Sequence, residues 1–279
     1  MSLDIYKFYL DKILNELGNQ ITETTFSGFG EIFVDHGIVD KIAYASTKDI
    51  DIHLLSNGSM LTPDTIDKIY KIGVKDIRIS LHTTNPDSYG RVMNYKSSKF
   101  DFKAVMHNVN YAIKNKPKDT EVIITADIVE ENKNDVDQMV LDFKDRCTLE
   151  VWYPHNWVYG KEYRDKSTPN TLKTCGRPFN GPIQIQIDGD IIMCCFDFNN
   201  ELVLGNFKNQ TLKEIFNAEK FQQLIKHHTD GTCLESNFIC NGCDQLKDKN
   251  DIVIYNNKVN ENKRANYTST AFADLSISQ

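Results

Sequence analysis

Six cysteines gather in the C-terminal half of this 279-residue chain, between positions 175 and 243. They are Cys175, Cys194, Cys195, Cys233, Cys240 and Cys243, and the seventh, Cys147, precedes them. An odd number of cysteines without a secretory signal argues against a disulfide framework. Thiolates are soft ligands that suit zinc, iron–sulfur clusters or cuprous ion. The cluster of thiols therefore predicts a metal centre.

The spacing of these cysteines indicates which of them share the centre. The CxxC segment Cys240-Asn241-Gly242-Cys243 lets two sulfurs face one site, with Gly242 easing the turn. Cys175 and Cys194 flank a predicted hairpin and complete four ligands, as structural zinc and cubane clusters both require. Cys195 directly follows Cys194, so in extended backbone it points to the opposite face. Cys195 is therefore a packing residue or an alternative ligand, and Cys233 is ambiguous.

The composition limits the class of protein. Hydrophobic residues make up 40% of the chain and charged residues 25%, which is enough apolar material for one large domain or two modest ones. A net charge of −7 argues against a nucleic-acid partner, which needs clustered Lys and Arg. No apolar stretch reaches the roughly 18 residues of a membrane helix, and residues 1–7 lack the features of a signal peptide. We expect a cytoplasmic protein with no membrane partner.

Strand-like and helix-like segments alternate through the first half of the chain, after an amphipathic helix over residues 3–17. Such alternation predicts a parallel sheet covered by helices, and it is compatible with an open sheet or a barrel. The predicted strands are 22–27, 50–56, 76–82, 121–129 and 149–154. In both architectures function lies at the carboxyl ends of the strands.

Small and polar residues follow three of these predicted strands. They are Gly28-Phe29-Gly30-Glu31, Asn57-Gly58 and Ser80. Further along, residues 183–193 predict a β-hairpin around Asp188-Gly189. Short helices are expected over 212–216 and 221–225.

Taken in order, these motifs resemble those of radical S-adenosylmethionine enzymes that carry a C-terminal SPASM domain. Cys175 is followed by thirteen residues, Gly189, four residues and Cys194, as at the start of a SPASM segment. Gly205-Asn206-Phe207, the stretch 211–216 and the Cys240–Cys243 pair follow, and the resemblance covers residues 3–245. It implies that Cys175, Cys194, Cys240 and Cys243 hold one auxiliary [4Fe–4S] cluster.

The resemblance also implies a site for S-adenosylmethionine. Gly28, Gly30 and Glu31 match the glycine-rich motif that receives the methionyl amino group, and Asn57 matches the next strand end. Ser80 would reach the ribose, and Arg91 would meet the carboxylate. The activity implied for the complete protein is formation of a 5′-deoxyadenosyl radical that modifies a peptide or small molecule. An electron donor such as flavodoxin or ferredoxin would be its partner.

The expected fold is an incomplete (β/α)6 partial TIM barrel over residues 1–160, without its first strand. A small SPASM-type α+β domain (161–249) and a polar C-terminal tail (250–279) would follow.

One departure from the family is clear. The CxxxCxxC motif that holds the catalytic cluster is missing, and no cysteine precedes Cys147. We expect a fragment that is inactive alone, and a form that has lost the cluster is the other explanation. The alternatives are a zinc-stabilised, non-catalytic binding module and a subunit of a split radical enzyme.

Overall fold

The computed structural model describes residues 1–94, 101–158, 172–247 and 252–256. The chain divides into two compact units, each made of segments that are distant in the sequence. The sheet unit contains residues 21–154 and 250–279, and the cysteine unit contains residues 1–20 and 155–249. None of the helices in the described ranges is long and apolar enough to cross a membrane.

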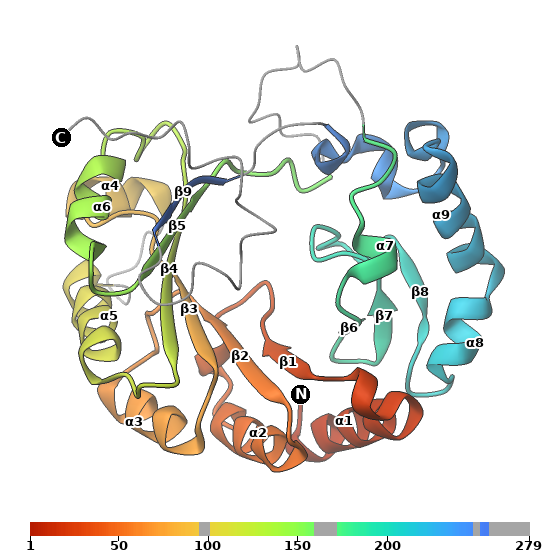
Figure 1. Cartoon of the computed structure of the whole chain (residues 1–279), viewed down its shortest axis with the longest axis horizontal. Coiled ribbons are helices and arrows are strands. Elements are labelled where there is room, and N and C mark those ends of the chain that lie inside the picture. Colours follow the sequence, from red (N-terminus) through yellow and green to blue (C-terminus); the bar gives the residue numbers. More distant parts are fainter. Residues whose placement is uncertain (95–100, 159–171, 248–251, 257–279) are drawn as a thin grey trace. The chain divides into compact units, whose positions relative to one another are not determined.

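A six-stranded sheet forms the sheet unit, in the order β1-β2-β3-β4-β5-β9 (Figure 1). Strands β1 to β5 are all parallel, which confirms the predicted five-stranded parallel sheet. Their bounds are Glu23–Phe26, Asp51–Ser56, Asp76–Ser80, Glu121–Asp127 and Thr148–Trp152.

Helices α2 (Ile38–Ala45), α3 (Pro63–Ile72), α5 (Phe102–Asn115) and α6 (Val136–Phe143) follow the outer side of this sheet (Figure 1). The short α4 (Pro86–Val92) and two 3-10 turns, η2 (Ile32–Val34) and η3 (Ser46–Lys48), complete the unit. Helix α3 shows how the local sequence sets the bounds. The Thr62 side chain accepts a hydrogen bond from the Thr65 N–H, Pro63 begins the helix, and Gly73 ends it at φ +92°.

The two faces of the sheet differ in chemistry because side chains alternate along each strand. The helix-facing side is apolar and buried; it includes Ile52, Leu54, Ile77, Ile79, Val122, Ile124, Leu149 and Val151. The opposite side, here called the inner face, carries Glu23, Thr25, His53, Asp76, Arg78, Ser80, Glu121, Thr125, Thr148 and Glu150. A doubly wound sheet needs helices on both faces, so a polar inner face favours the partial barrel.

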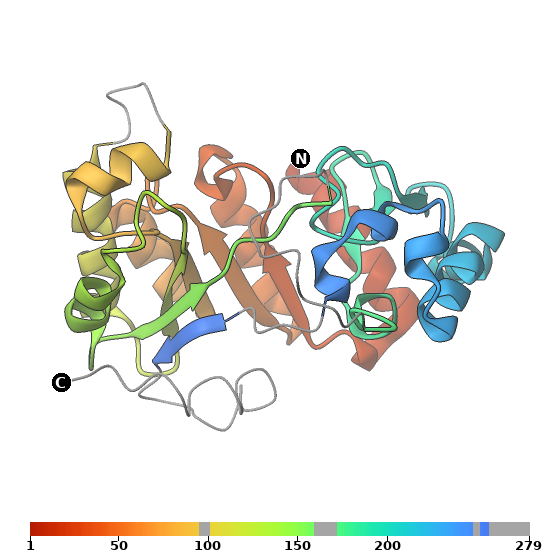
Figure 2. The same cartoon turned by 90° about the horizontal axis from the view of Figure 1, so that it is seen from above.

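Strand β9 (Ile252–Asn256) departs from the sequence-based expectation. The segment 250–279 is predicted to be a polar tail, yet residues 252–256 pair antiparallel with β5 at the edge of the sheet (Figure 2). The alternation of Ile252 and Ile254, which are only 5% and 8% exposed, gives this short run an apolar face. The remainder of the predicted tail, 257–279, lies outside the described residues.

The cysteine unit combines a small antiparallel sheet with short helices. Strands β6 (Gln184–Ile185) and β7 (Asp190–Ile192) form the predicted hairpin, and β8 (Val203–Asn206), which the sequence analysis missed, pairs with β7. The helices are α1 (Leu3–Leu17), α7 (Arg177–Asn180), α8 (Leu212–Asn217) and α9 (Glu219–Asp230). Four 3-10 turns, η1 (Gly18–Gln20), η4 (Cys233–Glu235), η5 (Ile239–Gly242) and η6 (Asp244–Leu246), complete it.

Helix α1 packs within the cysteine unit, although the predicted boundaries assign residues 1–160 to the barrel. Lys12 Nζ donates to the carbonyls of Phe207 (2.5 Å) and Gln210 (2.6 Å) and lies 4.4 Å from the Phe207 ring centroid. A Glu16 carboxylate oxygen accepts from the Leu212 N–H at 2.7 Å, at the first residue of α8. Two charged side chains of α1 therefore join it to the loop and helix that follow β8.

Replacing Lys12 with methionine tests this attachment. K12M keeps an apolar stem but leaves two backbone carbonyls without their charged donor. We expect the free energy of unfolding, measured in urea, to fall by about 1–3 kcal/mol. The control is K213M, at an exposed position on α8. Equal stability of K12M and K213M would contradict the conclusion that Lys12 attaches α1 to the loop after β8.

Candidate functional site

Glu31 connects the loop after β1 to the end of β2. One of its carboxylate oxygens accepts from Ser56 Oγ (2.8 Å) and the Phe33 N–H (3.2 Å). The other accepts from the Asn57 N–H at 2.6 Å. Ser56 Oγ in turn accepts from the Gly58 N–H at 2.9 Å. A charged acceptor with three donors fixes both loops, because hydrogen bonds to an ionised group are the strong ones.

The structural reason for a glycine differs among the glycines of these loops. Gly58 has φ +78°, and a Cβ there would lie 3.3 Å from Ile79 Cγ2, so backbone and packing both favour glycine. At Gly28 and Gly30 an added Cβ would meet no described atom within 4 Å apart from the adjacent residues, and neither glycine has a positive φ. Packing within the chain therefore does not explain Gly28 and Gly30.

The structure places two further predicted residues, Asn57 and Ser80, at neighbouring strand ends. The Asn57 side-chain oxygen accepts from the Ser59 N–H (3.0 Å) and Ser59 Oγ (2.6 Å), which closes the turn after β2. Ser80 ends β3, where its hydroxyl accepts from Thr125 Oγ1 at 3.3 Å. Because β1, β2 and β3 are adjacent and parallel, the Gly28–Glu31 loop, Asn57 and Ser80 share one edge of the sheet.

Arg91 is placed differently from the other predicted residues. It lies exposed on α4, and its guanidinium donates to Ser88 Oγ at 3.1 Å. Burial alone would raise the pKa of Asp135. Hydrogen bonds from Ser88, Thr83 and Asn85, with the charge of Arg91, hold that pKa below its ordinary value instead. The contacts that the structure gives Arg91 therefore lie on this loop, and none joins it to Glu31, Asn57 or Ser80 among the described residues.

His82, two residues after Ser80, is a polar group that the predicted site leaves out. Its backbone is left-handed (φ +65°), and its carbonyl accepts from Asn132 Nδ2 at 2.8 Å. The Asp127 N–H donates to His82 Nδ1 at 3.1 Å, so a neutral ring carries its proton on Nε2. Burial lowers the pKa of His82, which favours this neutral form.

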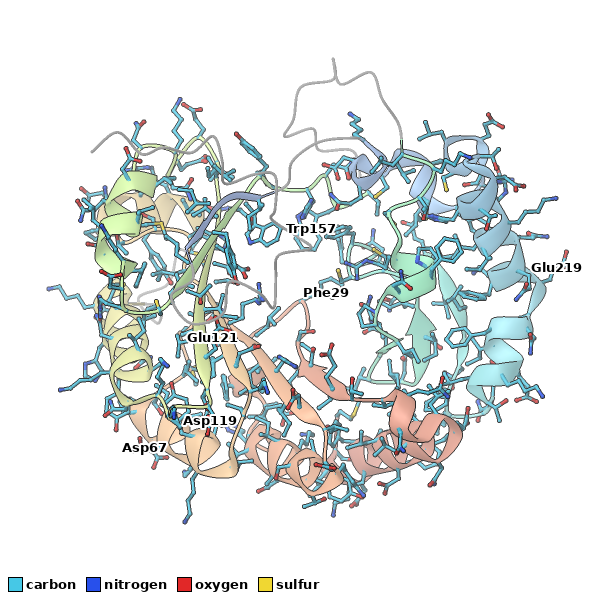
Figure 3. All side chains as sticks on the ribbon, viewed as in Figure 1. Phe29, Asp67, Asp119, Glu121, Trp157 and Glu219 are labelled. Atoms are coloured by element: carbon cyan, nitrogen blue, oxygen red, sulfur yellow. The ribbon has the colours of Figure 1, made fainter. Side chains whose placement is uncertain are left out.

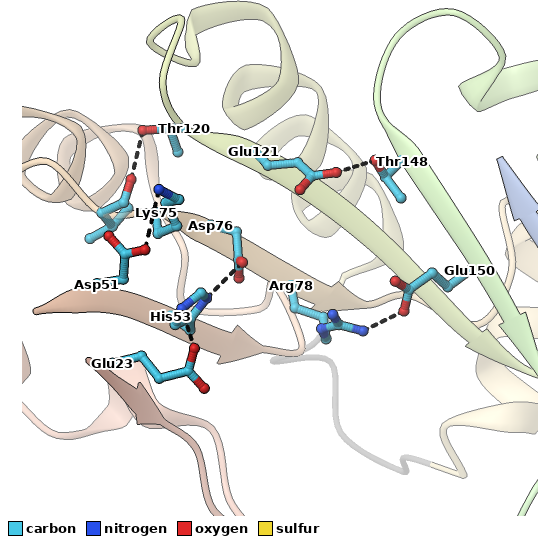
Figure 4. A network of polar contacts seen from close by, with 11 residues as sticks. Glu23, Asp51, His53, Lys75, Asp76, Arg78, Thr120, Glu121, Thr148 and Glu150 are labelled. Atoms are coloured by element: carbon cyan, nitrogen blue, oxygen red, sulfur yellow. Dashed lines mark hydrogen bonds and ion pairs between the residues drawn. The ribbon is translucent and has the colours of Figure 1, made fainter. Parts of the chain in front are cut away.

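Charged residues on the inner face form the network of Figure 4. His53 Nδ1 lies 2.7 Å from an Asp76 carboxylate oxygen, and His53 Nε2 lies 3.6 Å from one of Glu23. Arg78 pairs with Glu150, whose side chain is only 1% exposed. This network was not predicted from the sequence. Its signal is a charged or hydroxyl residue at each alternate position of β3 and at most of the corresponding positions of β2, β4 and β5. Figure 3 labels Glu121, which lies on β4, and Asp67, which lies on α3.

The cysteines occupy several turns of the cysteine unit. Cys175 is exposed, Cys233 is buried, and Cys194, Cys195, Cys240 and Cys243 are partly buried; none is in a disulfide. Burial, together with the nearby thiols of Cys243, Cys175 and Cys233, raises the pKa of Cys240 to about 12. The thiols of these four cysteines therefore interact electrostatically. Within the described ranges, no three potential ligands surround a single point closely enough for one metal ion.

The thiols of Cys194 and Cys195 shift each other's pKa in opposite directions. The hydrogen bond between the two thiols raises the pKa of Cys194 and lowers that of Cys195 to about 6. The Phe196 N–H also donates to Cys194 Sγ at 3.4 Å.

The segment 155–157 is tied to the CxxC turn. Asn156 Nδ2 donates to the Gly242 carbonyl (2.6 Å), and the Asn156 N–H donates to an Asp244 carboxylate oxygen (3.1 Å). Gln245 Nε2 lies 2.7 Å from His155 Nδ1. Asn156 and Asp244 are both buried. These contacts fix the position of the turn that carries Cys240 and Cys243.

Comparison with protein families assigns both regions. A radical SAM superfamily model matches residues 4–143, half of the chain, and a SPASM model, described as an iron–sulfur cluster-binding domain, matches residues 175–244. The chain belongs to the radical SAM superfamily. A search of curated protein sequences finds no match for this radical SAM protein.

Solved structures agree with this family at the level of the fold. BtrN in complex with AdoMet and 2-DOIA is 14% identical, with a TM-score of 0.55, over 88% of this chain and 80% of that chain. The anSMEcpe structure with AdoMet is 16% identical, with a TM-score of 0.62, over 81% and 74%. The anSMEcpe structure with AdoMet and the Cp18Cys peptide is 15% identical, with the same TM-score, over 89% and 84%. The radical SAM resemblance and the partial barrel with a SPASM region are thus confirmed.

Glu31 offers a direct test of the strand-end loops of this radical SAM protein. E31Q keeps the shape of the side chain but removes the charge and one of the two acceptor oxygens. We expect the free energy of unfolding in urea to fall by about 1–3 kcal/mol. E130Q is the control, because Glu130 makes only an exposed pair with Lys133. An unchanged stability of E31Q would contradict the connecting role of Glu31.

His53 predicts a pH dependence of stability. Its hydrogen bond to Asp76 raises the pKa of His53 in the folded protein, while burial opposes the shift. Protonated His53 therefore stabilises the fold fully below the unfolded pKa of about 6.5, and this stabilisation is lost as pH rises through the folded pKa. We expect the urea midpoint to fall as the pH rises above about 6.5 and through the raised folded pKa of His53, and to fall less in H53Q. H107Q, at an exposed position on α5, is the control. Parallel pH profiles for wild type and H53Q would refute the prediction.

Proposed function

We propose that the cysteine unit binds one auxiliary [4Fe–4S] cluster through Cys175, Cys194, Cys240 and Cys243. The observation that carries this proposal is the match of the iron–sulfur cluster-binding domain to residues 175–244, which contain all four cysteines. The donor set fits, because four thiolates are the usual ligands of a cubane. Each thiolate of a cubane binds a different iron atom, so the four need not surround one point. Cys195 is the alternative ligand to Cys194.

We further propose that the strand-end edge of the sheet binds S-adenosylmethionine. Because Gly28 and Gly30 have no side chain, a ligand can approach their backbone closely. Packing within the described residues gives no other reason for a glycine at either position. Glu31 orients this loop and Asn57, and Ser80 offers its hydroxyl at the next strand end. Arg91 donates to Ser88 in this structure. To reach the carboxylate of S-adenosylmethionine, it would have to leave Ser88, and α4 would have to bring it closer to the strand ends. When bound beside a reduced catalytic cluster, S-adenosylmethionine supplies the 5′-deoxyadenosyl radical that removes hydrogen from the substrate.

The substrate proposed for the complete protein is a peptide or small molecule that lies on the inner face. Arg78, held by buried Glu150, can orient polar groups there, and the helices on the other face exclude water from the core. A flavodoxin or ferredoxin would supply electrons in the cytoplasm.

The ligands of the catalytic cluster are proposed to come from outside the given sequence. It contains no CxxxCxxC motif and no cysteine before Cys147, whereas the strand-end residues are all present. The 279 residues alone are therefore expected to generate no radical. Supplied with a segment that carries the motif, they are expected to cleave S-adenosylmethionine.

Anaerobic reconstitution with iron and sulfide, followed by iron, sulfide and zinc assays, tests the cluster. We expect about four iron and four sulfide per chain, falling severalfold in C175A, C240A and C243A. C147A is the matched control, because Cys147 lies buried on the other unit. Stoichiometric zinc without sulfide would instead establish the zinc-stabilised module and overturn the proposal.

A further inference from the structure

Arg177 lies close to the cysteines in the sequence, and the described residues give it no carboxylate partner. It begins α7, two residues after Cys175, and its guanidinium carbon lies 5.7 Å from the ring centroid of Phe196. Phe196 follows Cys194-Cys195, and its N–H donates to Cys194 Sγ. The guanidinium therefore bridges the segment of Cys175 and the segment of Cys194.

The surroundings of Arg177 leave its charge uncompensated. The side chain is partly buried, and no ion pair joins it to an Asp or Glu in the part of the chain that the structure describes. Cys175 lies two residues before Arg177, and Phe196, whose ring centroid is 5.7 Å from the guanidinium carbon, donates its N–H to Cys194 Sγ. Cysteine segments are thus the neighbours of this cation. A partly buried cation without a counter-charge raises the free energy of the folded protein. An anion bound by the thiols would remove this penalty.

A four-thiolate cubane has the matching charge. Four thiolates around an oxidised [4Fe–4S] core with two positive charges give a dianion, and one further electron gives a trianion. A fixed cation nearby stabilises the reduced form more than the oxidised form, since the attraction grows with the charge. Net charge and nearby polar groups are among the factors that set such potentials.

We propose that Arg177 supplies the counter-charge of the auxiliary cluster and raises its reduction potential. The inference rests on the proposed function, because it requires the cluster. It assigns Arg177 an electrostatic, positioning role, in which the residue acts through the cluster and does not contact the reacting atoms.

Three variants separate charge from packing. R177M keeps an apolar stem against Phe196 without the charge, and R177K keeps the charge without the planar guanidinium. R146M is the control for net charge, because Arg146 is exposed on the sheet unit. Each protein is reconstituted anaerobically, assayed for iron and sulfide, and titrated with dithionite and mediators. Electron paramagnetic resonance then reports the fraction of the cluster that has gained one electron.

We expect R177M to retain its cluster with a lower midpoint potential. At the potential where the wild-type cluster is half reduced, the ratio of reduced to oxidised cluster should fall about tenfold, which corresponds to about 59 mV for one electron. R177K and R146M should remain close to wild type.

The other outcomes discriminate further. If R177M binds its cluster with the same midpoint reduction potential as wild type, the inference about Arg177 is overturned, whereas the proposed cluster is not. Loss of the cluster in R177M that R177K restores would support the need for charge, and loss shared by R177K would contradict it. A wild-type protein that binds no iron or sulfide would refute the proposed function itself.

Discussion

In a parallel sheet every strand ends at the same edge, and the candidate S-adenosylmethionine site depends on this constraint. β1, β2 and β3 are neighbours in the sheet and in the sequence, so the loops that follow them converge. Glu31 then makes the convergence specific, because its carboxylate accepts donors from its own loop and from the end of β2. The sheet provides the approximate position of the residues, and a charged hydrogen-bond network fixes it.

The same alternation of side chains that buries the apolar face of the sheet leaves a charged inner face. Burial lowers the pKa of Arg78, whereas Asp76, Glu121 and Tyr255 oppose that shift. Glu150 is held by Arg78, and Asp76 is held by His53. Charges at this depth are stable only when they are paired, so a ligand that displaces one partner must supply equivalent contacts. The inner face thus carries charges that are held in fixed pairs.

Local signals in the sequence predicted much of this structure. Thr62-Pro63 and Gly73 bound α3 as helix-capping rules require, and the five strands follow from apolar runs between polar loops. Long-range pairing was not predictable in the same way. β9 is a five-residue strand in a polar context, and α1 joins the cysteine unit through Lys12 and Glu16, whose partners lie nearly 200 positions away in sequence. Arg91 differs from the other predicted ligands in its contacts, since its guanidinium donates to Ser88 and its charge acts on Asp135. Its role toward a carboxylate stays a prediction. The His53–Asp76 and Arg78–Glu150 pairs depend on strand register, which the sequence pattern alone does not specify.

The central claim is that Cys175, Cys194, Cys240 and Cys243 hold one cubane cluster, with Arg177 beside it. X-ray diffraction from crystals of the reconstituted protein, with anomalous data on both sides of the iron absorption edge, tests it most directly. The account predicts a compact group of iron peaks, each within bonding distance of one of these four Sγ atoms, with Cys195 and Cys233 left unligated. A single peak at the zinc edge, or iron bound to Cys195 instead of Cys194, would contradict it.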